Sequence, residues 1–340
     1  LYGAVDTIFV GQFVGTNALA GVGVTFPITN TIMAVGMLVG IGAAARISIS
    51  LGQKKKNRAE KYLGNAVVLM IIGYALVGIL GKVMITGILG YLELNPEVAA
   101  YANKFTNIML IGSIFQIVGL GLNNVIRSCG SPKIAMFTMI IGGITNIILD
   151  YIFIVPFKMG VAGAAWATIL SRIITTAIYI RFLTKAEVKV SLALFAPTIR
   201  IYADIIKIGI SMLFLQLLQT LSICLLQKAA VKYGAEAVAA VGIVLKIVTL
   251  GTNVVFGFVK GLQPMAGYNY GAGNFQRLRE AVCCSLILST SFCVLWSILI
   301  VIFTSPIISC FGKDETMQEI ARIALRANTI MFFTFGFQFV

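Results

Sequence analysis

The chain has 340 residues, of which 59% are hydrophobic and only 11% are charged. Soluble proteins carry about 25% charged residues, so this composition indicates a polytopic membrane protein rather than a soluble domain. The formal net charge is +14, but the basic residues lie between apolar segments, as membrane anchors do. We therefore expect no nucleic-acid partner. The chain has no histidine and its six cysteines show no CxxC spacing, so we expect no metal site built on these residues.

Ten segments are long and apolar enough to cross a membrane as helices, for which about 20 residues are needed. The first of them is only a partial span, and the second contains Pro27, which predicts a kink. The predicted spans are Leu1–Val14, Ala18–Ser50, Leu63–Leu92, Tyr101–Ile126, Ile134–Val155, Val161–Leu183, Ile206–Val231, Ala237–Tyr268, Ala281–Phe311 and Ile320–Val340.

The connections between these spans differ in charge, which predicts their orientation. Four connections, at residues 52–61, 127–133, 181–207 and 271–279, carry 14 lysines and arginines. The connections on the opposite side carry only Lys158, Lys232 and Lys313. Because basic connections remain in the cytoplasm, the first set is predicted to be cytoplasmic. Arg46 lies near the same end of its span, where we expect it to snorkel to the interface.

An internal repeat relates the two halves of the chain. A shift of 219 residues aligns Ala18–Lys61 with Ala237–Glu280 without a gap, and identical pairs such as Gly42 with Gly261 and Arg58 with Arg277 recur. The repeat unit holds six spans, and an even number makes the two halves parallel.

The predicted fold is therefore an all-α polytopic membrane protein of two six-helix bundles. We expect an N-terminal lobe over residues 1–190, with helices 1–6, and a C-terminal lobe over residues 191–340, with helices 7–10. The last two helices of the second bundle are expected to lie beyond Val340.

Two acidic residues lie inside predicted spans, Asp6 in the first and Asp150 in the fifth. A carboxyl at membrane depth costs roughly 2.5–3.5 kcal/mol on insertion scales and is by default interpreted as functional. Asn146 precedes Asp150 by four residues, so a helix places both on one face. We predict that Asp6 and Asp150 share one pocket. The alternative is that both acids lie near helix ends and reach the interface.

Short motifs occur along essentially the whole chain. They are Val5–Gly11, Ala18–Gly21, Gly52-Gln53, Asn123–Arg127 before Gly130, Asn146–Asp150, Gly160–Ala165, and Gln263-Pro264 before Tyr268 and Gly271. In this order and spacing they resemble the multidrug and toxic compound extrusion (MATE) family, and more narrowly its bacterial MepA-like branch.

The resemblance implies a transporter of the bacterial inner (plasma) membrane, with twelve helices in two lobes and no enzymatic activity or cofactor. It would export cationic or amphipathic drug-like molecules in exchange for H+ or Na+, by alternating access of the two lobes. We expect it to work as a monomer.

The resemblance also implies a polar coupling pocket in the first lobe. By position, its members are Tyr2, Asp6, Asn123, Asn146, Asp150 and Thr168. Two carboxyls held close in a low-dielectric site cannot both ionise cheaply, so they titrate as a pair and can carry a proton. Sodium is the alternative, because Asp6, Asn146, Asp150 and Thr168 carry hard oxygen ligands. Packing is the competing interpretation for the uncharged members.

The sequence departs from the family pattern in places. Gly3 stands where the branch often has asparagine, and in the seventh helix Gln219 stands where some members carry glutamate. Ser211 replaces the usual proline, and an acid of the tenth helix would lie past Val340. We therefore expect Gln219 to line the pocket of the second lobe without coupling to the ion.

Drug-contacting residues are expected to be apolar and aromatic, because promiscuous sites use side chains that can repack. The candidates are Met33, Met37, Phe137, Met139, Phe214, Phe256 and Phe258, and ordinary lipid or core contacts explain them equally well. The alternative function is a flippase for a lipid-linked substrate. A membrane-embedded enzyme is not supported, because the sequence shows no nucleophile paired with a base. A channel is disfavoured by the two-lobe repeat.

Overall fold

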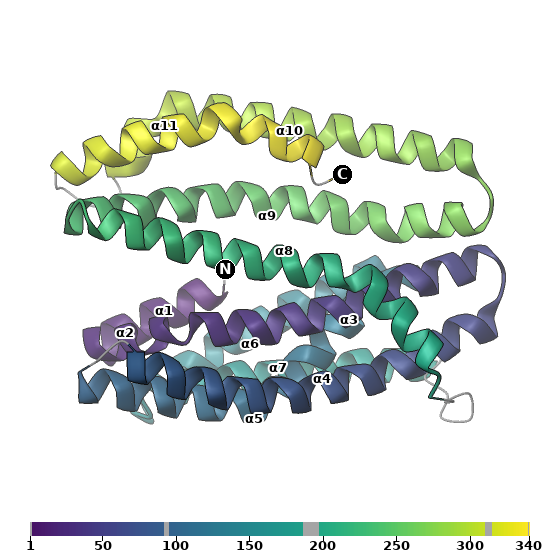
Figure 1. Ribbon diagram of the computed structural model, residues 1–340, viewed down its shortest axis with the longest axis horizontal. Helices are drawn as coiled ribbons and strands as arrows, with labels where there is room; N and C mark the ends of the chain where they lie inside the picture. The colour runs from purple at the N-terminus through teal and green to yellow at the C-terminus, as the bar shows by residue number, and fades with distance from the viewer. Residues whose placement is uncertain (1, 92–94, 186–196, 310–314, 339) are drawn as a thin grey trace. The chain divides into compact units, whose positions relative to one another are not determined.

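The computed structural model describes residues 2–91, 95–185, 197–309, 315–338 and 340, which form eleven α-helices (Figure 1). These are α1 (Tyr2–Phe13), α2 (Thr16–Val24), α3 (Phe26–Gly52), α4 (Lys56–Tyr91), α5 (Pro96–Ser128), α6 (Pro132–Ile154), α7 (Val161–Lys185), α8 (Ile199–Val231), α9 (Ala235–Gly271), α10 (Phe275–Ser309) and α11 (Glu315–Gln338). Among the described residues, eight of them, α3 to α10, are long and apolar enough to cross a membrane.

Every predicted span corresponds to a helix, and the second is divided in two. The helices of the first and last predicted spans, α1 and α11, are not among the eight apolar helices of the described residues. Helix α2 ends at Val24 and α3 begins at Phe26, with Thr25 between them. Pro27 occupies the first turn of α3, where its missing N–H removes no intrahelical hydrogen bond. The kink predicted from Pro27 is therefore confirmed as an interruption of the helix.

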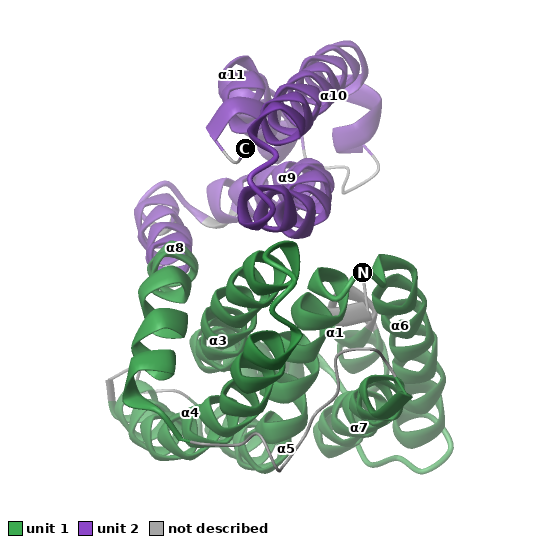
Figure 2. Cartoon of the chain, turned by 90° about the vertical axis from the view of Figure 1, so that its right-hand side faces the viewer, with its two compact units in different colours: residues 1–217 green, residues 218–340 purple. Residues whose placement is uncertain are grey.

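The chain divides into two compact units, residues 1–217 and 218–340 (Figure 2). This division by contacts falls within α8, so that helix begins in the first unit and ends in the second. The lobe boundary predicted at residue 190 follows the repeat of helices, whereas the contacts assign the first half of α8 to unit 1. The lobe boundary at residue 190 stays a prediction.

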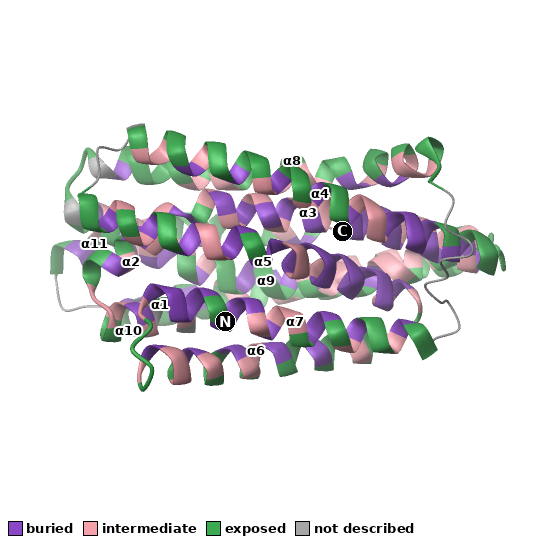
Figure 3. Cartoon of the chain, turned by 90° about the horizontal axis from the view of Figure 1, so that it is seen from below, coloured by how far each residue is buried: buried purple, intermediate pink, exposed green. Residues whose placement is uncertain are grey.

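Helix α5 is the centre of unit 1, because it packs against α2, α3, α4, α6 and α7. More than half of its residues are buried, and Figure 3 shows how burial is distributed over the helices. Glycines allow its neighbours to approach: a Cβ on Gly40 of α3 would lie only 2.7 Å from the Cα of Gly121. Small residues at such crossings are how helices pack in lipid, where burial of apolar surface gives no driving force.

The first half of α8 is held against α3 by two glycines. A side chain at Gly42 would collide with the carbonyl oxygen of Ile205, and one at Gly209 would collide with that of Leu38. Each helix therefore contributes a glycine that lies against the backbone of the other. This reciprocal contact explains why the start of α8 belongs to unit 1.

An ion pair reinforces the same contact. Arg46 Nη2 of α3 lies 3.0 Å from Asp204 Oδ1 of α8, and the Tyr62 hydroxyl of α4 donates to Asp204 Oδ2 over 2.7 Å. Arg46, which we expect to snorkel to the interface, thus also has a partner within the protein. Asp204 falls in a predicted connection, but α8 begins at Ile199 and turns the carboxylate toward α3.

Unit 2 contains the end of α8 and the mutually packed helices α9, α10 and α11. Its core joins Val244 of α9, Ile300 of α10 and Leu325 of α11. The repeat is visible in its backbone: Gly234, which precedes α9, has φ 102°, and its counterpart Gly15, which precedes α2, has φ 119°.

We predict that Gly42→Ala destabilises the protein, because the new Cβ forces α3 away from α8. Gly261→Ala is the matched control, since Gly261 is the repeat counterpart of Gly42 and a Cβ there meets no atom within 4 Å among the described residues. In detergent, the Gly42 variant should lose about 3 °C or more in Tm, the shift expected for roughly 1 kcal/mol. Equal Tm changes in the two variants would contradict the close contact.

Candidate functional site

Helices α1, α6 and α7 bring four of the predicted polar residues together inside unit 1. Helix α1 packs against both α6 and α7, and α6 packs against α7. The inner face of α6 is one stripe of buried residues spaced three or four apart: Ala135, Thr138, Gly142, Asn146, Asp150 and Ile154. Helical periodicity therefore aims Asn146 and Asp150 in the same inward direction, toward Asp6 of α1 and Thr168 of α7.

The Asp6 carboxyl interacts with each of the other three side chains. The Thr168 hydroxyl donates to Asp6 Oδ2 over 3.4 Å, which is a long hydrogen bond. The Asp6 carboxyl also interacts with the side chains of Asp150 and Asn146. Asp150 is fully buried and Asn146 is 1% exposed, so the structure brings the two acids together away from the surface. We call Asp6, Asn146, Asp150 and Thr168 the acidic pocket.

The acidic pocket contains polar atoms that lack partners. Both carboxyl oxygens of Asp150, the side-chain oxygen and nitrogen of Asn146, and Asp6 Oδ1 are buried without a direct hydrogen bond to described residues. Unsatisfied buried polar groups of this kind call for a ligand, an ion or water. The oxygens fit either a proton shared by the two carboxyls or a small hard cation such as Na+.

Asn123 makes its hydrogen bonds outside the acidic pocket. Its amide donates to the Tyr179 hydroxyl over 2.7 Å and to the Ala135 carbonyl over 3.1 Å. The Tyr179 hydroxyl in turn donates to the same carbonyl over 3.3 Å. This buried network ties α5, α6 and α7 together. The side chain of Tyr2 lies outside the described residues, although its backbone begins α1.

Sequence reasoning missed Tyr179. It is 2% exposed, and Arg127 of α5 and Arg172 of α7 lie in its neighbourhood. Arg172 precedes Tyr179 by seven residues, or two helical turns, so the two share one face of α7. The spacing of Arg172 and Tyr179 could have indicated this pair from the sequence, because an arginine inside an apolar span needs a polar neighbour.

The candidate substrate residues are dispersed over both units. Met33 and Met37 are half-buried on α3, Phe137 and Met139 are exposed on α6, Phe214 is exposed on α8, and Phe256 and Phe258 are half-buried on α9. Gln219 is exposed near the start of unit 2. The Phe258 ring lies 6.4 Å from that of Phe292, which is a packing contact within unit 2. The assignment of these residues to a drug cavity stays a prediction.

A family model described as MatE matches residues 1–152 and 208–340 of the chain. Two staphylococcal relatives are each named "Multidrug export protein MepA". The protein of Staphylococcus saprophyticus is 26% identical over 337 residues, and that of Staphylococcus aureus strain MRSA252 is 27% identical over 340 residues. Each match covers 96% of this chain and 73% of the relative.

Solved structures share the fold. A structure described as a MATE family transporter in an outward-facing conformation has a TM-score of 0.92 and 24% identity, covering 99% of this chain and 76% of that chain. A MOP superfamily transporter from Pyrococcus furiosus has a TM-score of 0.92 and 25% identity over the same shares. The arrangement of helices in the chain is therefore found in experimentally determined structures.

We predict that Asn123→Leu lowers the free energy of unfolding by about 1–3 kcal/mol, because two buried hydrogen bonds are lost. Asn103→Leu is the control, since Asn103 lies on the same helix and its one hydrogen bond, from Asn107, is exposed. The control should change stability by about 0.5 kcal/mol or less. Chemical denaturation in detergent measures both. If the two substitutions proved equally mild, the network would not be what holds α5 to α6 and α7.

Proposed function

Because the chain belongs to the MatE family, we propose that it is a secondary active multidrug efflux transporter that exports cationic or amphipathic drugs in exchange for H+ or Na+. Members of this family are transporters, and the two staphylococcal relatives are named for multidrug export. Eight apolar helices among the described residues and the bacterial relatives support a multi-pass bacterial membrane protein. The observation that carries the ion coupling is the fully buried carboxyl of Asp150 beside Asp6.

The proposed coupling works through a change in ion affinity. When the acidic pocket holds a proton or Na+, the ion satisfies carboxyl oxygens that have no direct partner among the described residues. Loss of the ion leaves two carboxylates and no compensating cation in a buried site, which favours a different arrangement of α1 relative to α6 and α7. An ion gradient can drive transport only through such a difference in affinity between two conformations. Thr168 orients the Asp6 carboxyl through its hydrogen bond.

Alternating access of two lobes is the proposed conformational cycle, and the parallel repeat supports it. In this proposal the basic connections face the cytoplasm, so drug enters from that side and leaves on the other. Met33, Met37 and Phe214 in unit 1, with Phe256 and Phe258 in unit 2, remain the proposed drug contacts. Phe137, Met139, Gln219 and Tyr2 complete the proposed lining.

We expect Asp150→Asn to fold, to bind drug and to lose gradient-driven efflux. The amide keeps the shape and one oxygen but cannot carry the proton, and a neutral group is easier to insert than a carboxylate. The measurement is uptake of a cationic dye into proteoliposomes under a pH gradient or a sodium gradient, each imposed separately. Wild-type protein should respond to the proton gradient, and Asp150→Asn should respond to neither.

The control for this experiment is Asp204→Asn. It makes the same chemical change at an acid of unit 1 that pairs with Arg46, outside the acidic pocket. Transport by Asp204→Asn should keep its response to the gradient, even if the protein is less stable. Full gradient-driven transport by Asp150→Asn at normal protein levels would remove Asp150 from the mechanism.

We expect Gln219→Ala to leave the ion dependence of efflux unchanged, because an amide cannot titrate. The range of drugs carried can change, since Gln219 is an exposed polar side chain near the start of unit 2. Efflux of several dyes at different pH and sodium concentrations tests this. Loss of the pH or sodium response in this variant would move the coupling site to the second lobe.

A further inference from the structure

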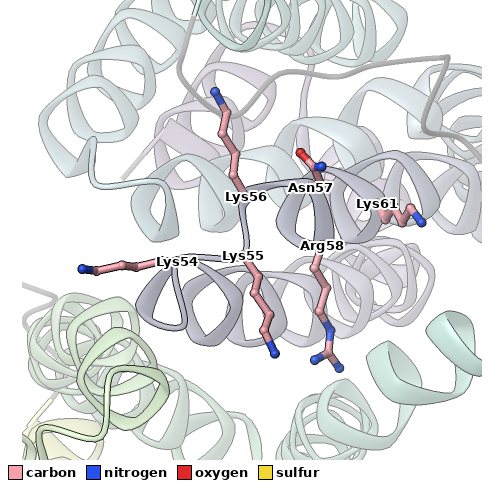
Figure 4. Close-up of a pocket in the computed structure, with 6 residues that line it drawn as sticks. All are labelled: Lys54, Lys55, Lys56, Asn57, Arg58 and Lys61. Atoms are coloured by element: carbon pink, nitrogen blue, oxygen red, sulfur yellow. The ribbon is translucent and has the colours of Figure 1, made fainter.

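The turn between α3 and α4 carries the densest positive charge of the described chain. Its pocket of about 510 Å³ is lined by Lys54, Lys55, Lys56, Asn57, Arg58 and Lys61, all of which are exposed. Figure 4 shows the side chains of Lys55 and Arg58 extending to the same side of the turn. A group with negative charge can therefore meet these two cations at once, whereas Lys54, Lys56 and Lys61 extend in other directions.

Glu60 is the one acid within residues 54–61, against five cations. Among the residues that the structure describes, none of the five cations of the turn has an acidic partner within 4.0 Å, whereas Arg46 nearby on α3 has Asp204. Arg58 lies over the Tyr62 ring, 5.8 Å from its centroid, which is a contact that leaves its charge in place. The turn also leads into the N-terminus of α4, whose first N–H groups add positive potential.

The repeat shows that the backbone of the turn does not require these lysines. Lys55 N donates to the carbonyl of Ser50 over 2.9 Å, and in the second half Asn274 N donates to that of Asn269 over 2.9 Å. The preceding residues, Lys54 and Gly273, both have left-handed φ, at 59° and 74°. The shift of 219 residues thus relates two turns of the same geometry, of which only the first is lysine-rich.

The first turn contains a lysine in an unfavourable backbone conformation. A residue with a Cβ is less stable than glycine in the left-handed region, because its Cβ lies too close to the backbone. Gly273 avoids this penalty at the equivalent position, whereas Lys54 does not. Neither the geometry nor the stability of the turn requires lysine here. The lysines agree with the cytoplasmic orientation predicted for this connection, and there their charge is available to a partner.

The neighbouring surface indicates a lipid as that partner. Exposed apolar residues form a stripe along α4: Ile72, Leu76, Ile79 and Val83. Arg58 precedes Leu76 by 18 residues, which is five helical turns, so this cation and the stripe lie on one face of α4. Ile72 lies about 21 Å along the helix axis from Arg58. An acyl chain on this stripe therefore has its headgroup on the side of the turn.

We propose that the turn at residues 54–61 binds the phosphate headgroup of an anionic phospholipid in the leaflet that the turn faces. Lys55 and Arg58 contact the phosphate, and Lys54, Lys56 and Lys61 attract it electrostatically. Clusters of four to eight basic residues beside a membrane helix bind anionic headgroups in this way. The site is separate from the acidic pocket and does not depend on the transported ion.

The test transplants the second turn into the first. The triple variant Lys54→Gly, Lys55→Asn, Lys56→Phe takes its residues from positions 273–275, which build the same backbone. The control triple variant Lys185→Gln, Arg277→Gln, Arg279→Gln removes equal charge from other exposed positions. Native mass spectrometry of the purified full chain in neutral detergent measures bound phosphatidylglycerol and, as a neutral reference, phosphatidylcholine.

Wild-type and control protein should bind phosphatidylglycerol at least about tenfold more tightly than the transplanted variant, with phosphatidylcholine unaffected. The double variant Lys55→Gln, Arg58→Gln should show the same loss if the triple variant folds poorly. Equal phosphatidylglycerol binding in wild type and either turn variant would overturn the proposal. Displacement of the lipid by inorganic phosphate would overturn it in favour of a free anion.

Discussion

The fully buried carboxyl of Asp150 is the constraint on which unit 1 depends. Hydrocarbon cannot solvate it, so the surrounding helices must supply polar neighbours, and they do so from both sides. Helix α1 contributes Asp6 and α7 contributes Thr168, while Asn146 lies one turn away on α6 itself. The contacts of α1 with α6 and α7 thus bury polar atoms that need an occupant, and the stability of this packing is linked to that occupant.

Helix α5 holds α6 and α7 in place on a side away from the acidic pocket. The occupant of the pocket can therefore affect the packing of α1 without separating α6 from α7. The network of Asn123, Tyr179 and the Ala135 carbonyl joins the three helices through fully protein-based hydrogen bonds. Two kinds of polar group therefore occur in unit 1. The network of Asn123 and Tyr179 has its hydrogen bonds supplied by the protein and holds its helices in place. The acidic pocket has atoms without partners among the described residues and can respond to an ion.

Hydrophobic length and helical spacing were enough to predict the spans, the interruption at Pro27 and the inward pairing of Asn146 with Asp150. The meeting of Asp6 with Asp150 was also expected, because both are acids inside apolar spans, but other contacts between distant helices were not predictable. The pairing of Arg46 with Asp204 needs α8 to cross α3, and no local pattern encodes that crossing. Gly42 and Gly261 illustrate the same limit, because identical residues at equivalent repeat positions meet a crowded backbone in one half and open space in the other.

The assignment of α8 to both units has a practical consequence for dividing the chain into fragments. A fragment that ends at Lys185 would lack the helical segment against which Gly42 and Arg46 pack, and would leave the arginine without its acid. A fragment that starts at Pro197 would carry Asp204 and Gly209 away from their partners on α3. A division in the turn between α9 and α10 would keep the contacts of α8 with α3 within one fragment, and would separate α9 from the helices α10 and α11 against which it packs.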